Sequence, residues 1–310
     1  MHIFLCVQHL PCEALLFKRT IMDCAILFPD EREKGKTRFE QCHLVLLRML
    51  KILDYLCNKH DIKYFLTAGT LLGAVRHKGF IPWDDDLDIG MTRDNYEKFV
   101  RYAVPELPDD IFFQTPETDV YPSCHGAEAK LRDRYSSYPI SNGKKWHQGL
   151  MLDVMVYDRA FLPHNIFIYA LNRLMAALYW GIKCHNEGNN KRAKVLNAIS
   201  RWTPFPLVYS NMYIRKRYMV RKFGANYFTE REIRHAEKAE FEGLTVAIPK
   251  GWHSYLERKY GDYMKLPPVE KRVNHHGNGL PEPMKPCQHT KALDWKNRTK
   301  AVQKRTLLAS

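Results

Sequence analysis

Apolar residues recur every three or four positions behind a polar opening at Thr37-x-x-Glu40. A Thr followed three residues later by Glu forms a capping box, which begins a helix. The spacing then predicts a helix of about five turns that ends near Asn58. Its apolar positions are Phe39, Cys42, Leu46, Met49, Leu53 and Leu56.

Shorter apolar runs follow, bounded by Gly, Pro and Asp, which is typical of strands and short helices. Strands are predicted at 61–67, 86–91, 111–115, 129–134, 149–157 and 241–249. A turn is predicted at 68–70 and short helices at 71–76, after Thr92 and at 252–260. Longer helical patterns occupy 166–185, 191–200 and 208–223.

This change in pattern divides the chain. We expect a poorly structured segment at 1–36, a mixed α/β catalytic core at 37–160, a mainly helical region packed on it at 161–272, and a basic polar tail at 273–310. Residues 1–27 lack the pattern of a secretory signal, and Met22 is an alternative start. The stretch 166–182 is too short and too polar to span a membrane, so we weigh a core helix against a helix lying on a membrane surface.

The amino-acid composition indicates the charge of the ligands that the protein binds and the redox state of its compartment. The 310 residues carry a formal charge of +14, which favours nucleotides, nucleic acid, anionic lipid or phosphorylated glycans. The eight cysteines form no Cys-x-x-Cys pair, which argues against a disulfide framework or a zinc ribbon and indicates a reducing compartment. A zinc site from His275, His276, Cys287 and His289 is an alternative with irregular spacing.

Four carboxylates lie within five residues, at Asp84, Asp85, Asp86 and Asp88. In a strand, Asp84, Asp86 and Asp88 would share one face, with neighbours about 7 Å apart. At an effective dielectric of about 20, each adjacent pair repels by about 2 kcal/mol. A cation between the acids relieves this repulsion, and hard oxygen ligands suit Mg²⁺ or Mn²⁺. The motif predicts metal-assisted chemistry on a phosphate, although a solvated aspartate turn is the simpler alternative.

Asp153 is a further candidate metal ligand, and it lies in an apolar run between Leu152 and Val154. A buried carboxylate is costly unless it is paired or bound to metal. If its strand adjoins the acidic one, Asp153 faces Asp86 and Asp88 and takes the proton of an incoming hydroxyl. The alternative is an acid at a strand edge paired with an arginine, and a large distance from the acidic strand would exclude the shared site.

Several residues are candidates for contact with phosphate. Gly69 and Thr70 form a turn whose backbone N–H groups can bind phosphate, helped by the start of the helix that follows. Lys130 and Arg132 alternate on one strand face towards a donor pyrophosphate, or form surface ion pairs. Arg76 contacts phosphate or belongs to a solvated basic loop. Trp83 stacks on a base or choline, or packs in the core.

This order of motifs resembles the nucleotidyltransferase superfamily of the polymerase-β type. More narrowly, GTLLGAVRH at 69–77, running into IPWDDDLD at 81–88, resembles the LicD and fukutin family of phosphotransferases. Supporting matches follow at 130–133 (KLRD), 241–243 (FEG) and 260–264 (YGDYM), so that the resemblance spans 55–272.

The resemblance implies an α+β fold, with a nucleotidyltransferase-like mixed sheet core and an added C-terminal helical region. It implies metal-dependent transfer of phosphocholine or a polyol phosphate from a CDP-linked donor to a cell-surface glycan, such as lipopolysaccharide or teichoic acid, with release of CMP. Asp86 and Asp88 become metal ligands, with Asp84 as a further contributor. Asp153 matches the third acidic position, although Val154-Met155-Val156 replaces the Phe-Pro-Leu run common in bacterial members.

Two other functions stay open. The same core would serve a nucleotidyltransferase acting on a small molecule or nucleic acid, which would release pyrophosphate. A non-catalytic glycan- or membrane-binding module is the second. We expect a cytoplasmic enzyme at the inner face of the membrane with a nucleotide donor and a glycan or lipid-linked glycan acceptor, and we do not expect nucleic acid as its partner.

Overall fold

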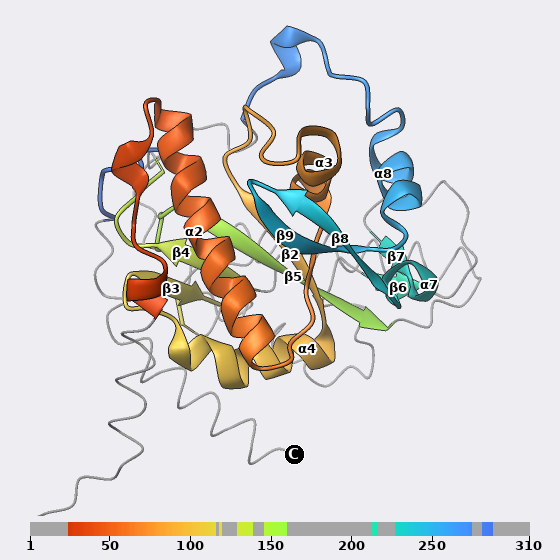
Figure 1. The fold of residues 1–310 in the computed structure, drawn as a ribbon, viewed down its shortest axis with the longest axis horizontal. Helices are drawn as coiled ribbons and strands as arrows, with labels where there is room; N and C mark the ends of the chain where they lie inside the picture. The colour runs from red at the N-terminus through yellow and green to blue at the C-terminus, as the bar shows by residue number, and fades with distance from the viewer. Residues whose placement is uncertain are drawn as a thin grey trace, which may run out of the picture.

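A mixed β-sheet forms the centre of the part of the chain described by the computed structural model, residues 24–115, 118–119, 129–138, 146–159, 213–215, 227–274 and 281–287. Its main strands run in the order β1-β2-β5-β4-β3 (Figure 1). The β2–β5 pair is parallel, and the β1–β2, β5–β4 and β4–β3 pairs are antiparallel. The bounds are β1 Phe65–Leu66, β2 Leu87–Thr92, β3 Ile111–Gln114, β4 Ala129–Asp133 and β5 Met151–Arg159.

Two short strands extend the sheet beyond β5. β6 (Tyr213–Arg215) pairs in parallel with β5 and with β7 (Tyr227–Thr229). The helix predicted over 208–223 is therefore wrong at 213–215, because these residues join the backbone ladder of the sheet. The sheet and its helices confirm the α+β class, while a nucleotidyltransferase-like core stays a prediction.

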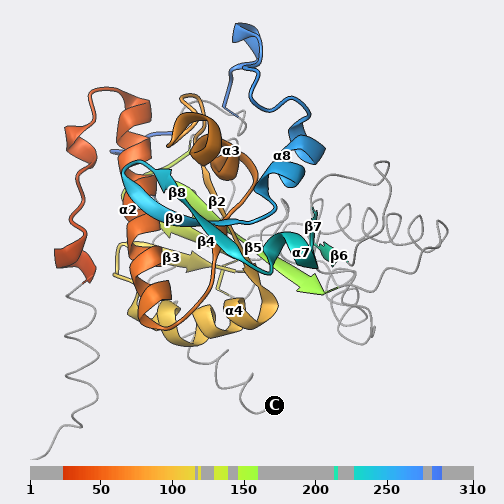
Figure 2. The same ribbon diagram turned by 45° about the vertical axis from the view of Figure 1, so that its right-hand side comes forward.

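Helix α2 (Arg38–Lys59) begins where the capping box predicts. Thr37 Oγ1 accepts a hydrogen bond from Glu40 N at 3.1 Å, and the Glu40 carboxylate accepts one from Thr37 N at 3.3 Å. The predicted apolar stripe is buried from Cys42 to Leu56. Figures 1 and 2 show α2 lying along one face of the sheet, where this stripe joins the core.

Helix α3 (Ala68–His77) connects β1 to the loop that carries the acids. Ala68, Gly69 and Thr70 form its first turn, since Thr67 O accepts from Leu71 N at 3.0 Å, so the separate turn predicted there is wrong. After β2, α4 (Arg93–Lys98) continues into π-helical η2 (Phe99–Ala103) and 3₁₀-helical η3 (Val104–Glu106), which confirms a helix after Thr92.

A two-stranded hairpin packs against the start of the acidic loop. It consists of β8 (Ala236–Phe241) and β9 (Leu244–Pro249), between α7 (Glu230–Ile233) and α8 (Trp252–Tyr260). Its turn residue Glu242 donates from its backbone N to Lys78 O at 2.9 Å and accepts from Phe80 N at 3.0 Å. A Cβ at Gly79 would displace the Glu242 carboxylate from its contact with Phe80 N, so glycine at this position preserves that contact. The hairpin therefore sets the course of the loop towards the acids.

Residues 24–36, expected to be poorly structured, are attached to the end of β4. Arg32, in the 3₁₀ turn η1 (Arg32–Lys34), donates to both oxygens of the buried Asp133 at 3.0 and 2.7 Å. It also donates to Pro283 O at 2.6 Å. A bidentate buried pair of this kind holds the segment firmly against β4.

Other predictions fall outside the described residues. These are the helices at 166–185 and 191–200, the N-terminal residues up to 23, His275, His276 and His289. Cys287 is described, is buried, and accepts from Gln148 N at 3.2 Å. The domain boundaries at 160 and 272 stay predictions. Among the described helices, none combines the length and the apolar character needed to cross a bilayer.

Candidate active site

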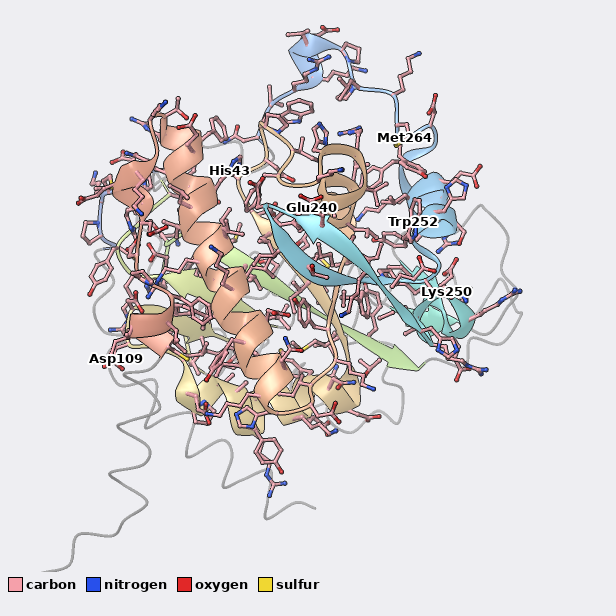
Figure 3. The ribbon with its side chains drawn as sticks, viewed as in Figure 1. His43, Asp109, Glu240, Lys250, Trp252 and Met264 are labelled. Carbon is pink, nitrogen blue, oxygen red and sulfur yellow. The ribbon has the colours of Figure 1, made fainter. Side chains whose placement is uncertain are left out.

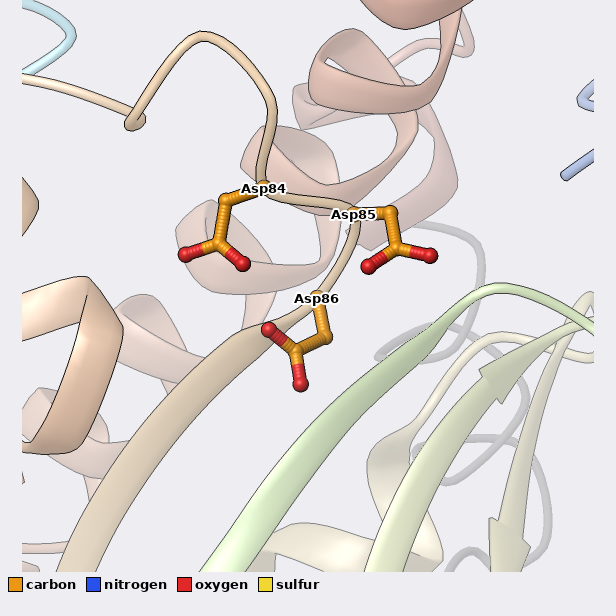
Figure 4. A group of neighbouring side chains, drawn as sticks. All are labelled: Asp84, Asp85 and Asp86. Carbon is orange, nitrogen blue, oxygen red and sulfur yellow. The ribbon is translucent and has the colours of Figure 1, made fainter. Parts of the chain in front are cut away.

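The acids form a bend between α3 and β2. Asp88 lies in β2, whereas Asp84 and Asp86 precede the strand, so strand alternation does not describe the whole motif. Oxygens of Asp84, Asp85 and Asp86 nevertheless lie within 4.8 Å of one another (Figure 4). The bend itself is a turn in which Asp84 N donates to Ile81 O at 2.9 Å.

Two side chains hold the backbone of this bend. His43, labelled in Figure 3, reaches from α2 and its Nε2 lies 2.9 Å from Asp84 O. The Tyr138 hydroxyl donates to Asp85 O at 2.7 Å. The His43 ring also stacks on Phe80 at 4.2 Å between centroids, and its burial lowers its pKa. The bend is thus fixed from two sides of the fold.

Asp88 and Asp153 lie directly opposite each other in the parallel β2–β5 pair. Adjacent strands are about 4.8 Å apart, and residues in register point to the same face. Both side chains are buried. The strand register therefore places Asp153, the third predicted acid, beside the acidic strand.

The acids raise each other's affinity for protons. Burial, with the charges of Asp86 and Asp85, raises the pKa of Asp84 to about 8. Burial, with Asp86 and Asp153, raises the pKa of Asp88 well above its usual range. Concentrated negative charge out of water favours a compensating cation. The carboxylate oxygens of Asp84, Asp85 and Asp86, within 4.8 Å of one another, are ligands of the type that Mg²⁺ and Mn²⁺ take, so these three acids fit such an ion.

The first turn of α3 holds Asp88 and Asp84 in place. Thr70 Oγ1 accepts from Asp88 N at 2.7 Å, and Thr67 N donates to Asp88 O at 3.2 Å. Gly69 leaves room for an acid, since a Cβ there would lie 2.9 Å from Asp84 Oδ2. Gly69 and Thr70, predicted to contact phosphate, here position the carboxylates at a helix N-terminus.

Replacing Thr70 by Val should lower the free energy of unfolding by about 1–3 kcal/mol, because Asp88 N would lose its acceptor while buried. Thr70→Ser keeps the hydroxyl and should lose less than the Val variant. Urea unfolding of both variants measures the difference. Equal losses in the two would show that the hydroxyl does not hold Asp88.

Lys130 and Arg132 both bind protein acceptors. Lys130 Nζ lies 2.5 Å from both oxygens of Asp153, with both residues buried. Arg132 donates to Gln114 Oε1 and to Gly149 O, each at 2.7 Å. Lys130 therefore belongs to the acidic site, while Arg132 supports the neighbouring strand and loop, and its contact with a donor stays a prediction.

Three cations near the acidic loop have no ion-pair partner among the described residues: Lys259, which acts on Asp88, and Arg76 and Arg272, which lie beside Tyr263 and Trp83. The charge of Lys259 acts on Asp88 and lowers its pKa. Arg272 lies over the Trp83 ring at 5.5 Å, and its charge contributes, after burial, to lowering the pKa of Arg76. Unpaired cations that destabilise one another are suited to bind an anion.

Helix α8 brings Lys259 near Asp88, and the sequence analysis did not predict this residue as part of the site. The Thr67 hydroxyl contacts the hydroxyls of Tyr157 at 3.0 Å and Tyr255 at 3.3 Å. Lys259 Nζ donates to the Tyr255 hydroxyl at 3.5 Å. Burial, Tyr255 and the nearby Asp88 raise the pKa of Tyr260. The YGDYM match at 260–264 was the available signal, but it begins one residue after Lys259.

Trp83 lies between the two environments that were predicted for it. Its side chain is half-buried and packs against the core. Arg272 covers the ring, and His77 meets it edge-on at 6.4 Å between centroids. The Trp83 ring therefore packs against the core and also contacts Arg272.

Comparisons with known proteins match this site. Residues 61–136 match the family described as "LicD/FKTN/FKRP, nucleotidyltransferase domain". The chain is 30% identical over 260 residues to the "Lipopolysaccharide cholinephosphotransferase LicD" of Haemophilus influenzae, covering 78% of this chain and 97% of that protein. Uncharacterized proteins of Rickettsia typhi and Rickettsia prowazekii are 50% and 52% identical over 99 and 82 residues, about a third of each.

The match to the Haemophilus protein extends over nearly the whole of that relative. It is accordingly much broader than the segment shared with the Rickettsia proteins. The chain belongs to the LicD family.

Proposed function

We propose that this protein is a metal-dependent phosphotransferase. It moves phosphocholine, or a polyol phosphate, from a CDP-linked donor to a hydroxyl of a lipid-linked glycan such as lipopolysaccharide. The name of the Haemophilus relative supports phosphocholine and lipopolysaccharide, and the long shared region supports a common reaction. A CDP donor, Mg²⁺ or Mn²⁺, and a site at the inner face of a membrane complete the proposal.

The observation that carries the proposal is the register of Asp88 with Asp153 beside the acidic bend. A solvated aspartate turn would not require a buried acid from another strand. Lys259 acts on Asp88, and Arg272 lies over Trp83, which precedes the acids, so cations that could contact phosphate support the proposal. Asp86, Asp88 and Asp153 would hold the ion, with Asp84 as a further ligand.

The reaction joins the acceptor oxygen to the outer phosphorus of the donor and breaks that phosphorus's bond to the bridging oxygen. CMP leaves with the electron pair of that bond. Arg76, Lys259 and Arg272 bind the anionic oxygens and orient the donor for in-line attack. The hydroxyl proton passes to a carboxylate of the cluster; this role was predicted for Asp153, although both of its oxygens accept from Lys130 in this structure. A bound divalent ion supplies neutralisation of charge at the phosphate oxygens.

Product analysis tests this proposal against its rivals. The purified protein is incubated with Mg²⁺, a lipopolysaccharide acceptor and, in separate reactions, CDP-choline, CDP-ribitol, CDP-glycerol or CTP. Release of CMP with labelled acceptor is the expected result. Release of pyrophosphate from CTP would instead support a nucleotidyltransferase, and failure of every donor with bound glycan would support a non-catalytic module.

The acids also predict how pH and metal affect stability. The pKa of Asp84 is about 8 in the folded protein, above its unfolded value, and the pKa of Asp88 is raised too. The folded state therefore binds more protons, and the metal-free protein should lose stability as pH rises from about 4 to about 8. Mn²⁺ should raise the melting temperature more at about pH 8.5 than at about pH 5.5, since protons compete with it. No response to Mn²⁺ at either pH would contradict a metal site.

A further inference from the structure

The segment after α8 leaves the body of the protein and returns to it. Residues 261–273, here named the tip loop, carry the 3₁₀ turn η5 (Val269–Lys271) at their far end (Figures 1 and 2). Four large apolar side chains of the tip loop are exposed: Met264 56%, Leu266 45%, Val269 73% and Val273 57%. Met264 is labelled in Figure 3, beyond the end of α8. Such a concentration in one projecting segment is unusual for surface that faces only water.

The tip loop has a defined shape. Arg272 Nε donates to Pro267 O at 2.9 Å, and Arg272 N donates to Val269 O at 3.0 Å. Pro267 and Pro268 restrict the backbone before the turn. The exposed apolar side chains are therefore presented by an ordered turn, so little conformational entropy is lost when they bind.

Both ends of the tip loop lie against the candidate site. At the start of the tip loop, Arg76 donates to Tyr263 O at 2.8 Å. The last residue of α8, Tyr260, is close enough to Asp88 for the charge of that acid to raise its pKa. At the end of the tip loop, Arg272 covers Trp83, which precedes Asp84. Whatever the tip loop contacts is thereby placed next to the acidic cluster.

The charges around these apolar residues favour an anionic surface. Lys265 and Lys271 are exposed on the tip loop, and Arg272 lies at its base. Asp262 and Glu270 oppose them, but cations exceed carboxylates, and the whole chain carries +14. Apolar side chains flanked by Lys and Arg are typical of segments that lie in a lipid interface.

We propose that the tip loop inserts its apolar side chains into the surface of an anionic lipid bilayer. The membrane would then lie beside the acids, where a lipid-linked hydroxyl can reach them. This goes beyond the proposed phosphotransfer, and lipid binding does not depend on it.

Sedimentation with vesicles tests the proposal. The full chain is mixed with vesicles of phosphatidylcholine containing phosphatidylglycerol, and with vesicles of phosphatidylcholine alone. We expect binding to the anionic vesicles, and a loss of about tenfold or more in the Leu266→Ser/Val269→Ser variant, which removes two apolar anchors. The double variant Ile26→Ser/Met284→Ser, with similarly exposed residues outside the tip loop, is the matched control and should bind as the wild type does.

Three results would overturn the proposal: wild-type protein that ignores anionic vesicles, a tip-loop variant that binds as well as the wild type, or equal loss in the control variant. If the wild type ignores vesicles but forms a dimer that the tip-loop variant cannot form, the surface pairs two copies. The melting-temperature response to Mn²⁺ rests on the acids and should be the same in all variants. If the wild type binds anionic vesicles but its melting temperature does not respond to Mn²⁺, the metal site is rejected and the lipid-binding proposal stands.

Discussion

Asp88→Asn should reduce CMP release by about a thousandfold or more while the protein stays folded. The substitution removes one charge from the centre of the acidic cluster and keeps the shape of the side chain. The backbone bonds that Asp88 makes to Thr70 and Thr67 do not depend on the carboxylate. Asp86→Ala and Asp88→Ala should also abolish turnover.

The same variant should be more stable than the wild type without metal. The pKa of Asp88 is raised by burial and by Asp86 and Asp153, so ionising it costs stability in the folded state. Asp88→Asn should therefore raise the metal-free melting temperature at about pH 8 and abolish the response to Mn²⁺. Asp94→Asn, exposed in α4, is the control for a changed charge. Near-native turnover in Asp88→Asn would reject the assignment of the site.

Lys130→Met should lower the free energy of unfolding by about 3–5 kcal/mol, the largest change in stability that we expect. The ammonium donates to both oxygens of Asp153, and both groups are buried. Met has similar length but leaves the carboxylate without this cation.

A second substitution separates the ion pair from packing. Lys130→Met/Asp153→Leu removes both charges and should recover most of the lost stability, since apolar replacements of buried pairs are often neutral. Lys63→Met, at an exposed lysine, should change stability by no more than about 0.5 kcal/mol. Denaturant unfolding gives all three values. If the double variant is as unstable as Lys130→Met, packing rather than charge explains the effect.

Periodic sequence patterns predicted the helices of the core well. The capping box placed the start of α2, and the spacing around Tyr255 placed α8 at Trp252–Tyr260. The polar strand β8 (AEKAEF) was missed, because most of its side chains are exposed and show no apolar alternation. It is a strand because β9 supplies its hydrogen-bond partners.

The candidate site was predictable in its acids and less so in its cations. Asp88 and Asp153 can be recognised as candidates from the sequence, because a carboxylate buried in an apolar strand requires a compensating cation or hydrogen bonds. Lys259 is an ordinary helical lysine in the sequence, and tertiary contacts such as that between Tyr255 and Thr67 bring it near Asp88. For Arg132 the sequence suggested a contact with phosphate, from its place on one face of a strand. In the structure its guanidinium donates to Gln114 on the neighbouring strand.

The parallel pairing of β2 with β5 affects when the site can form during synthesis. β2 and β5 are separated in the chain by β3 and β4, so the acids cannot meet until the ribosome has released β5. Contacts between distant segments form slowly. Until then the nascent chain carries an uncompensated cluster of aspartates, and a product truncated before β5 would hold the first acids without the partner that completes the site.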